Sequence, residues 1–166
     1  MTDPQVEFTS FYRVQFSQVV RTVFLIVNDR GRAEEIAQDA FLQLLSHWAR
    51  VSKYERPDAW VRRVAIRMAC RAARRERLGR RLLTIHAGRD EPSAPAPGSG
   101  GGEIFHLVGG LPPSQRAAVV LFYYEDRPVA DIAELLGCTP TTARVHLHKA
   151  RQRLATLLHE EVEDVV

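Results

Sequence analysis

Residues 86–103, HAGRDEPSAPAPGSGGGE, interrupt the chain with a segment rich in proline, glycine, alanine and serine. A segment of this composition has no periodic apolar face and cannot bury a core, so it predicts a flexible linker. No single folded unit is expected to run across it. The sequence therefore predicts two modules, residues 1–85 and 104–166, joined by this linker.

Both flanking segments carry apolar residues at intervals of three and four, and neither contains a run in which apolar and polar residues alternate. The first spacing is that of an α-helix with one buried face, whereas alternation would indicate a strand. We therefore expect an all-α protein made of two small helical domains. The expected helices are 5–27, 32–49, 58–78, 104–109, 113–125, 129–136 and 140–159.

Composition narrows the class of protein further. Hydrophobic residues make up 45% and charged residues 26% of the 166 residues, which is ordinary for a globular protein and not for a disordered one. No apolar run approaches the roughly 18 residues of a membrane span. Residues 1–6 lack a basic residue, so no secretory signal is expected, and Cys70 and Cys138 match no metal or redox spacing. These features predict a reduced, cytoplasmic protein without membrane insertion.

The net charge of +3 conceals two basic segments. Residues 50–89 carry 13 basic and 3 acidic side chains, and residues 137–155 carry 4 basic and no acidic ones. Residues 90–136, between them, carry 7 acidic and 2 basic side chains. Two separated basic segments are typical of a protein that holds a polyanion at two places.

The stretch 129–151 has the features of a helix-turn-helix. Gly137 can adopt the positive φ that ends a first helix, and Thr139 with Pro140 suits the start of a second. The apolar positions of the second helix face the core, so a basic face points outward and suits a DNA major groove. A two-helix hairpin with a solvated basic face is the alternative interpretation. The outward residues are Arg144, Val145, His148, Lys149 and Gln152.

The helix expected at 58–78 carries a second basic surface. Four arginines recur there at spacings of four, four and three, so they share one face, and Trp60 lies at its head. Phosphates can bind such arginines, and an unstacked base can stack on an aromatic ring. Trp60 could instead be a core anchor. The arginines are Arg63, Arg67, Arg71 and Arg74, and the preceding loop adds Lys53, Tyr54 and Arg56.

The helix expected at 32–49 places Leu42 on its polar side, among Glu35, Gln38 and Asp39. An apolar residue within a polar rim is the layout of a protein interface, although an isolated exposed leucine is also common. The opposite side of this helix is expected to be buried. Its residues are Ala33, Ile36, Ala37, Ala40, Phe41, Leu44, Leu45 and Trp48.

Three stretches, in this order, resemble the extracytoplasmic-function sigma factors, the small two-domain group of the sigma-70 family. They are AEEIAQDAFLQLL at 33–45, AWVRRVAIRMACRAARR at 59–75, and the segment 111–154 that contains the helix-turn-helix. The resemblance implies a transcription initiation factor with no catalytic site and no cofactor. Such a factor binds core RNA polymerase and promoter DNA, recognises the −35 and −10 elements and promotes DNA melting. The resemblance further implies control by a separate anti-sigma factor.

The resemblance also assigns roles to individual residues. The implied polymerase-binding residues are Gln38, Asp39 and Leu42, with Glu35 beside them. The implied −10 residues are Lys53, Tyr54, Arg56, Trp60, Arg63, Arg67 and Arg71. The implied −35 residues are Thr142, Arg144, Val145, His148, Lys149 and Arg151, of which Thr142 and Arg151 would lie near phosphates. The family often has uncharged polar residues at the positions of Arg67 and Arg71, so these arginines favour backbone binding over base reading.

The residues also bear on two other functions. A stand-alone helix-turn-helix regulator is the alternative, and such proteins usually bind palindromic sites as dimers. An enzyme acting on nucleic acid is disfavoured, because the sequence shows no paired carboxylates and no phosphate-binding loop. No metal site is expected, since His146 and His148 are two residues apart on a helix and point in different directions.

Overall fold

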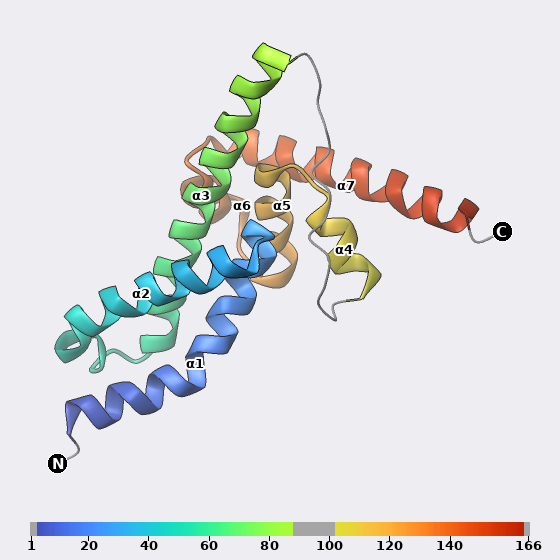
Figure 1. The fold of residues 1–166 in the computed structure, drawn as a ribbon. Helices are drawn as coiled ribbons and strands as arrows, with labels where there is room; N and C mark the ends of the chain where they lie inside the picture. The colour runs from blue at the N-terminus through green and yellow to red at the C-terminus, as the bar shows by residue number, and fades with distance from the viewer. Residues whose placement is uncertain (1–2, 88–101, 165–166) are drawn as a thin grey trace. The chain divides into compact units, whose positions relative to one another are not determined.

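The structure is a computed structural model that describes residues 3–87 and 102–164 (Figure 1). These residues form helices and connecting turns, with no strand among them, which confirms the predicted all-α fold class. Of the predicted linker, residues 88–101 lie outside the described residues. The elements are α1 (Pro4–Val27), α2 (Arg30–Val51), α3 (Pro57–Ala87), α4 (Glu103–Gly109), α5 (Pro113–Val119), the π-helical turn η1 (Val120–Tyr124), α6 (Val129–Leu136) and α7 (Pro140–Asp164).

Contacts between residues divide the chain into two compact units, Met1–Ala69 and Cys70–Val166. The boundary falls within α3, which runs nine residues beyond the end predicted at residue 78. The first unit therefore contains α1, α2 and the start of α3. The second unit contains the remainder of α3 and the helices from α4 to α7.

The first unit is built on the packing of α1 against α2 (Figure 1). Aromatic rings occupy much of this contact: the Phe11 ring centroid lies 5.3 Å from that of Trp48, and the Tyr12 centroid lies 5.1 Å from that of Phe41. Farther along α1, the side chains of Val23 and other aliphatic residues are completely buried. Tilted and edge-to-face ring pairs contribute roughly 0.5–1.5 kcal/mol each beyond the area they bury.

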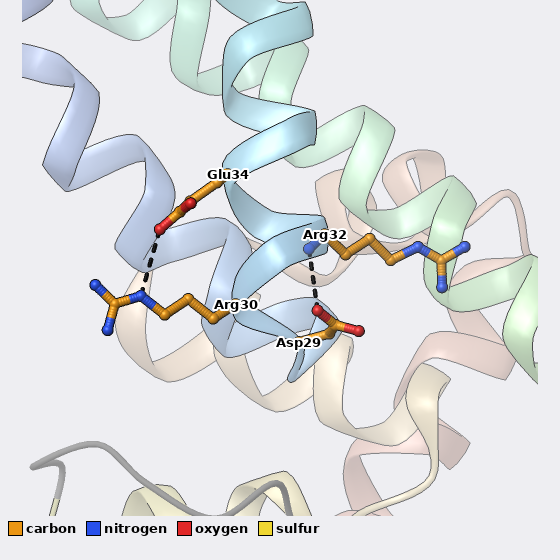
Figure 2. Close-up of polar contacts among 4 residues, drawn as sticks. All are labelled: Asp29, Arg30, Arg32 and Glu34. Atoms are coloured by element: carbon orange, nitrogen blue, oxygen red, sulfur yellow. Dashed lines mark hydrogen bonds and ion pairs between the residues drawn. The ribbon is translucent and has the colours of Figure 1, made fainter.

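The connection from α1 to α2 is short because two adjacent residues cap the two helices. Asn28 has a left-handed φ of 55°, and its N–H donates to a carbonyl of the last turn of α1 at 2.8 Å. Asp29 caps α2, and its Oδ1 accepts a hydrogen bond from the backbone N–H of Arg32 at 3.0 Å (Figure 2). Arg30 forms an exposed ion pair with Glu34 at 3.3 Å in the same turn. Asparagine tolerates positive φ and aspartate is a strong N-cap, which explains why the chain reverses here.

The face of α2 predicted to be buried is buried at most of its positions, but the prediction for Leu45 is wrong. The Leu45 side chain is 50% exposed, and Ile36 is only partly buried. At about 100° per residue, both positions lie roughly 90° from the centre of the face that carries Phe41 and Leu44. A helix packed mainly against one neighbour leaves such edge positions open to solvent.

In the second unit, α5, α6 and α7 pack on one another around an aliphatic core. Leu121, Ile132 and Leu147 are almost completely buried in it, and Leu107 of α4 adds to it. Through its contacts with both α6 and α7, α5 supports the helix-turn-helix.

A guanidinium group is also buried in this core. Arg116 of α5 is 1% exposed, and its Nη1 donates to the carbonyl oxygen of Leu111 at 3.1 Å. Its Nη2 lies 3.6 Å from the carboxylate of Glu76, in the part of α3 that belongs to this unit. A charge removed from water needs such partners, because nothing else compensates for its lost hydration.

The helix predicted at 113–125 is interrupted at Val120, where α5 gives way to η1. The carbonyl oxygen of Val120 accepts from the N–H of Glu125 at 3.0 Å, five residues later instead of four. The carbonyl oxygen of Leu121 accepts from the N–H of Arg127 at 2.8 Å, six residues later. A single π-helical turn of this kind often marks a functional position. Here it carries the aromatic sequence Phe122, Tyr123 and Tyr124.

Candidate nucleic-acid interface

The turn between α6 and α7 has the geometry predicted from its sequence. Gly137 ends α6 with φ of 66°, and the N–H of Cys138 donates to the carbonyl of Ala133 at 3.0 Å. The Oγ1 of Thr139 then accepts from the backbone N–H of Thr142 at 3.2 Å and caps α7. Both helix ends are therefore satisfied locally, which fixes the direction of α7 relative to α6.

The face of α7 that was predicted to point outward is exposed, and we call it the recognition face. Behind it, Ala143, Leu147 and Ala150 are buried against the other helices of the unit. Because the sequence holds no acidic residue between positions 137 and 155, the surface combines positive charge with a helix narrow enough for a major groove. The recognition face consists of Arg144, Val145, His148, Lys149 and Gln152.

Thr142 and Arg151 flank the recognition face, and both already have partners in the chain. The Thr142 hydroxyl lies 2.9 Å from that of Thr139, so it belongs to the helix cap. The Nε of Arg151 donates to the hydroxyl of Tyr123 at 2.8 Å. Sequence reasoning did not find the role of Tyr123, because the pair is separated by 28 positions and no local spacing connects it.

His146 lies on the side of α7 between the recognition face and the core. Partial burial lowers the pKa of its imidazole below the usual value of 6.5, and the positive charges of Arg77 and Lys149 lower that pKa further. The neutral form is therefore favoured, which agrees with a packing role for this histidine. His148, in contrast, is exposed on the recognition face.

The second basic surface lies on α3, and we call Arg63, Arg67, Arg71 and Arg74 the arginine stripe. Arg67, Arg71 and Arg74 are exposed and Arg63 is partly buried. The opposite face of α3 is buried through Val61, Ala65, Ile66 and Ala69. Small alanines on the buried side allow close packing while the long arginines extend into solvent.

At the head of the stripe, Trp60 is partly buried and packs beside His47 of α2, with ring centroids 5.7 Å apart. The His47 Nδ1 also lies 2.8 Å from the carbonyl oxygen of Gln43. Trp60 thus packs against a neighbouring helix, and its contact with an unpaired base stays a prediction. His47 was not among the predicted site residues, since it lies on a different helix.

The loop between α2 and α3 carries three further predicted residues, Lys53, Tyr54 and Arg56, all of them exposed. Arg56 is held by Asp58 through two hydrogen bonds of 2.8 and 3.1 Å. Its guanidinium lowers the pKa of the Asp58 carboxyl. An exposed ion pair contributes little to stability, so Arg56 can exchange this carboxylate for a phosphate at little cost.

On α2 the structure places Leu42 where the sequence analysis expected it. Its side chain is 63% exposed, and the surrounding Glu35, Gln38 and Asp39 are exposed too. Leu45, one turn later, is half exposed and enlarges the apolar area. We call these five residues the Leu42 surface.

Metal binding and membrane insertion were both expected to be absent. Within residues 3–87 and 102–164, no three His, Cys, Asp or Glu side chains come close enough to share a metal ion. None of the helices described in those ranges is both long and apolar enough to cross a bilayer. Cys70 and Cys138 are free thiols, and burial raises the pKa of Cys70 to about 12, which keeps this thiol protonated.

Comparison with known families finds two matches in chain order. Residues 12–78 match the model of sigma-70 region 2, and residues 102–154 match that of sigma-70 region 4. Region 2 covers most of α1, α2 and the arginine stripe. Region 4 covers the helices from α4 to the middle of α7, including the recognition face.

Curated relatives and a solved structure agree with these matches. The chain is 26% identical over 161 residues to the RNA polymerase sigma-E factor of Streptomyces avermitilis, covering 95% of this chain and 86% of that protein. It is 28% identical over 142 residues to the RNA polymerase sigma factor CarQ of Myxococcus xanthus, covering 81% and 79%. The fold is similar, with a TM-score of 0.56 and 22% identity, to the sigma factor RpoE of Bartonella quintana crystallised with the anti-sigma factor NepR, covering 92% of this chain and 97% of that one.

Proposed function

This chain belongs to the sigma-70 family as an extracytoplasmic-function sigma factor, and from that membership we propose which of its surfaces perform transcription initiation. The observation that carries the proposal is the recognition face of α7, held outward by a capped helix-turn-helix. The arginine stripe on α3 is a second basic helix face, and it also supports the proposal. A stand-alone helix-turn-helix regulator is not favoured, because such a protein would have no need of region 2.

We assign the −35 element to the second half of the chain, with residues 104–166 as the region 4 domain. The recognition face would enter the major groove, with Arg144 and its neighbours near base edges. Thr142 and Arg151, at its two ends, would meet phosphates. The support for this assignment is the exposure of the basic side chains and the direction in which the caps hold α7.

We assign the −10 element to α3 and the loop before it, within a region 2 domain of residues 1–85. The arginine stripe, from which Arg63, Arg67 and Arg71 are the expected contacts, would hold phosphates of the opened strand. Lys53, Tyr54, Arg56 and Trp60 would surround the unpaired bases. Separating a base-pair step costs on the order of 1.4 kcal/mol. Stacking one base on an aromatic ring returns roughly 1–3 kcal/mol, so Tyr54 and Trp60 could favour local melting.

We assign polymerase binding to the Leu42 surface. An exposed apolar centre with a polar rim is the arrangement of a protein interface, and the half-exposed Leu45 widens that centre beyond the predicted single leucine. The factor would act without a catalytic site or a cofactor, in the cytoplasm where the polymerase works. Control by an anti-sigma factor is proposed from the similar Bartonella fold, which was crystallised with such a partner.

Transcription in vitro from a pool of random promoters tests the function. With core polymerase, the chain is expected to select templates that share two elements at a fixed spacing. Without core, promoter binding in a gel-shift assay is expected to be much weaker. Equal affinity with and without core, or a selected palindrome, would contradict the proposal and favour a stand-alone regulator.

Substitution of Arg144 tests the −35 assignment on the selected promoter. R144A is expected to cost about 1–3 kcal/mol on the preferred base pair and little on a promoter mutated at that position. R153A is the matched control, because Arg153 is also exposed but lies half a turn around α7. A uniform loss on all promoters would make Arg144 a phosphate contact.

A further inference from the structure

The turn η1 places two aromatic rings against Arg151 of α7. Besides the 2.8 Å hydrogen bond to the Tyr123 hydroxyl, the guanidinium carbon of Arg151 lies 5.4 Å from the ring centroid of Phe122 and 5.6 Å from that of Tyr123. The two rings meet edge to face, with centroids 4.9 Å apart. Tyr123 remains 60% exposed, so burial in the core does not explain this arrangement. The contacts instead fix the position of an exposed arginine.

Arg151 continues the recognition face along α7. Arg144, His148 and Arg151 are separated by four and three residues, so they form one stripe on the helix. Arg151 lies about 10 Å beyond Arg144 along the axis, at 1.5 Å per residue. The major groove is about 12 Å wide, so when the first turns of a helix contact bases, a residue at this distance lies near the flanking phosphates.

The way in which Arg151 is held leaves the right donors available. A guanidinium has five N–H groups, and the Tyr123 hydroxyl accepts only the one on Nε. The four N–H groups on Nη1 and Nη2 remain, and this edge matches two oxygens of a phosphate. An arginine stacked on rings and held at Nε loses less conformational freedom when the phosphate binds.

We propose that Tyr123, with Phe122, positions Arg151 for a bidentate contact with a backbone phosphate beside the −35 element. This inference rests on the proposed function of α7 and adds residues of η1 to its DNA-binding site. Tyr123 is a positioning residue, because it acts through Arg151. The π-helical turn is what directs the Tyr123 hydroxyl toward the side chain of α7.

The test measures binding of the holoenzyme, full chain plus core polymerase, to its selected promoter over a series of salt concentrations. Four chains are compared: wild type, Y123F, R151Q and the double variant. R151Q is expected to weaken binding and to reduce the slope of log affinity against log salt by about 0.9, the value for one phosphate contact. Y123F, which removes only the hydroxyl, is expected to weaken binding about two- to tenfold. In the R151Q background, Y123F is expected to have no further effect.

Matched controls come from the same elements. Tyr124 lies in the same turn and is also exposed, so Y124F should leave promoter affinity unchanged. R153Q removes the same charge from α7 outside the stripe and should leave the salt slope unchanged. The thermal unfolding midpoint of Y123F should equal that of wild type, which separates positioning from a loss of folding.

Three results would overturn the proposal. One is wild-type affinity and salt slope for Y123F. Another is a Y123F effect of the same size in the R151Q background, which would mean that Tyr123 acts independently of Arg151. The third is failure of the wild-type chain to bind promoter DNA even with core polymerase, which would remove the proposed function itself and the positioning role with it.

Discussion

The first unit joins α1 to α2 through a row of rings, from Phe8 to Phe16 on one helix and Phe41 and Trp48 on the other. In the second unit the short helices α4, α5 and α6 pack with the longer α7 around an aliphatic core, and the unit depends on a few special positions, among them Arg116, Gly137 and Thr139. Long helices can bury a stripe that is distributed over many residues. Short helices expose a larger share of their unpaired ends, so caps and turns carry more of the stability.

The two tryptophans, Trp48 and Trp60, both lie in the first unit, which allows the units to be followed separately. Tryptophan fluorescence reports on the first unit, and helical circular dichroism reports on both. Recording both signals in the full chain therefore shows which unit each of the following substitutions affects.

The largest effect is expected for F41A in the first unit. The Phe41 ring is buried against Phe11, Tyr12 and Phe16, so its removal leaves a cavity and should cost about 3–5 kcal/mol of unfolding free energy. Urea unfolding followed by tryptophan fluorescence measures it. L42A, at the adjacent exposed position, should stay within about 0.5 kcal/mol of wild type. A cost for F41A below about 1 kcal/mol would break the account of a ring-based core.

The next largest effect is expected for R116A in the second unit. It removes the guanidinium between Leu111 and the partly exposed Glu76, and should cost about 2–3 kcal/mol, seen by circular dichroism. R116M keeps much of the volume without the charge and should recover part of this loss. If R116A unfolds at the wild-type denaturant concentration, the buried charge is not an anchor of the second unit.

Smaller effects on stability are expected when two glycines are replaced by alanine. The two effects should have opposite signs, so each substitution is a control for the other. G137A forces alanine into φ of 66°, and its Cβ would lie 2.8 Å from Nη1 of Arg74, so a loss of about 1–2 kcal/mol is expected. G79A lies inside α3 with no atom within 4 Å of the added Cβ, and should raise stability by about 0.4–1 kcal/mol. Thermal unfolding of both variants measures the difference. If both substitutions changed the stability in the same direction, conformational strain would not explain the effect of G137A.

The smallest effect is expected for the pH dependence linked to His146. Its pKa is lowered in the folded chain, so the unfolded chain takes up the proton first as the pH falls. The stability that neutral His146 contributes is therefore fully present above the unfolded pKa of about 6.5 and is lost as the pH decreases below it. H146Q should flatten the fall of the unfolding midpoint between pH 6.5 and 5.

Helix positions and caps were predictable because they depend on residues close together in the sequence. The turn of Gly137 and Thr139, and the exposed faces that carry Arg144 and Leu42, follow from spacing alone. The exposure of Leu45 was missed because an edge position depends on how much a neighbouring helix covers it. The extension of α3 beyond residue 78 was missed because Leu82 and Leu83 are exposed there and mark no buried face.

The helix faces that form the candidate site were predictable from the sequence, but the side-chain contacts within the site were not. The bond between Tyr123 and Arg151 joins different elements, as does the packing of His47 beside Trp60. The turn η1 was also missed, since a π-helical hydrogen bond leaves no distinctive spacing of apolar residues in five positions. Only the folded structure shows which arginines have their N–H donors oriented by other side chains before DNA binds.

At the π-helical turn η1, the fold depends on the number of residues as well as on which residues they are. One residue more than an α-helical turn is accommodated between Val120 and Glu125. A one-codon deletion there would restore ordinary α-helix and rotate everything on one side of it by about 100°. Natural variation should therefore rarely shorten this turn.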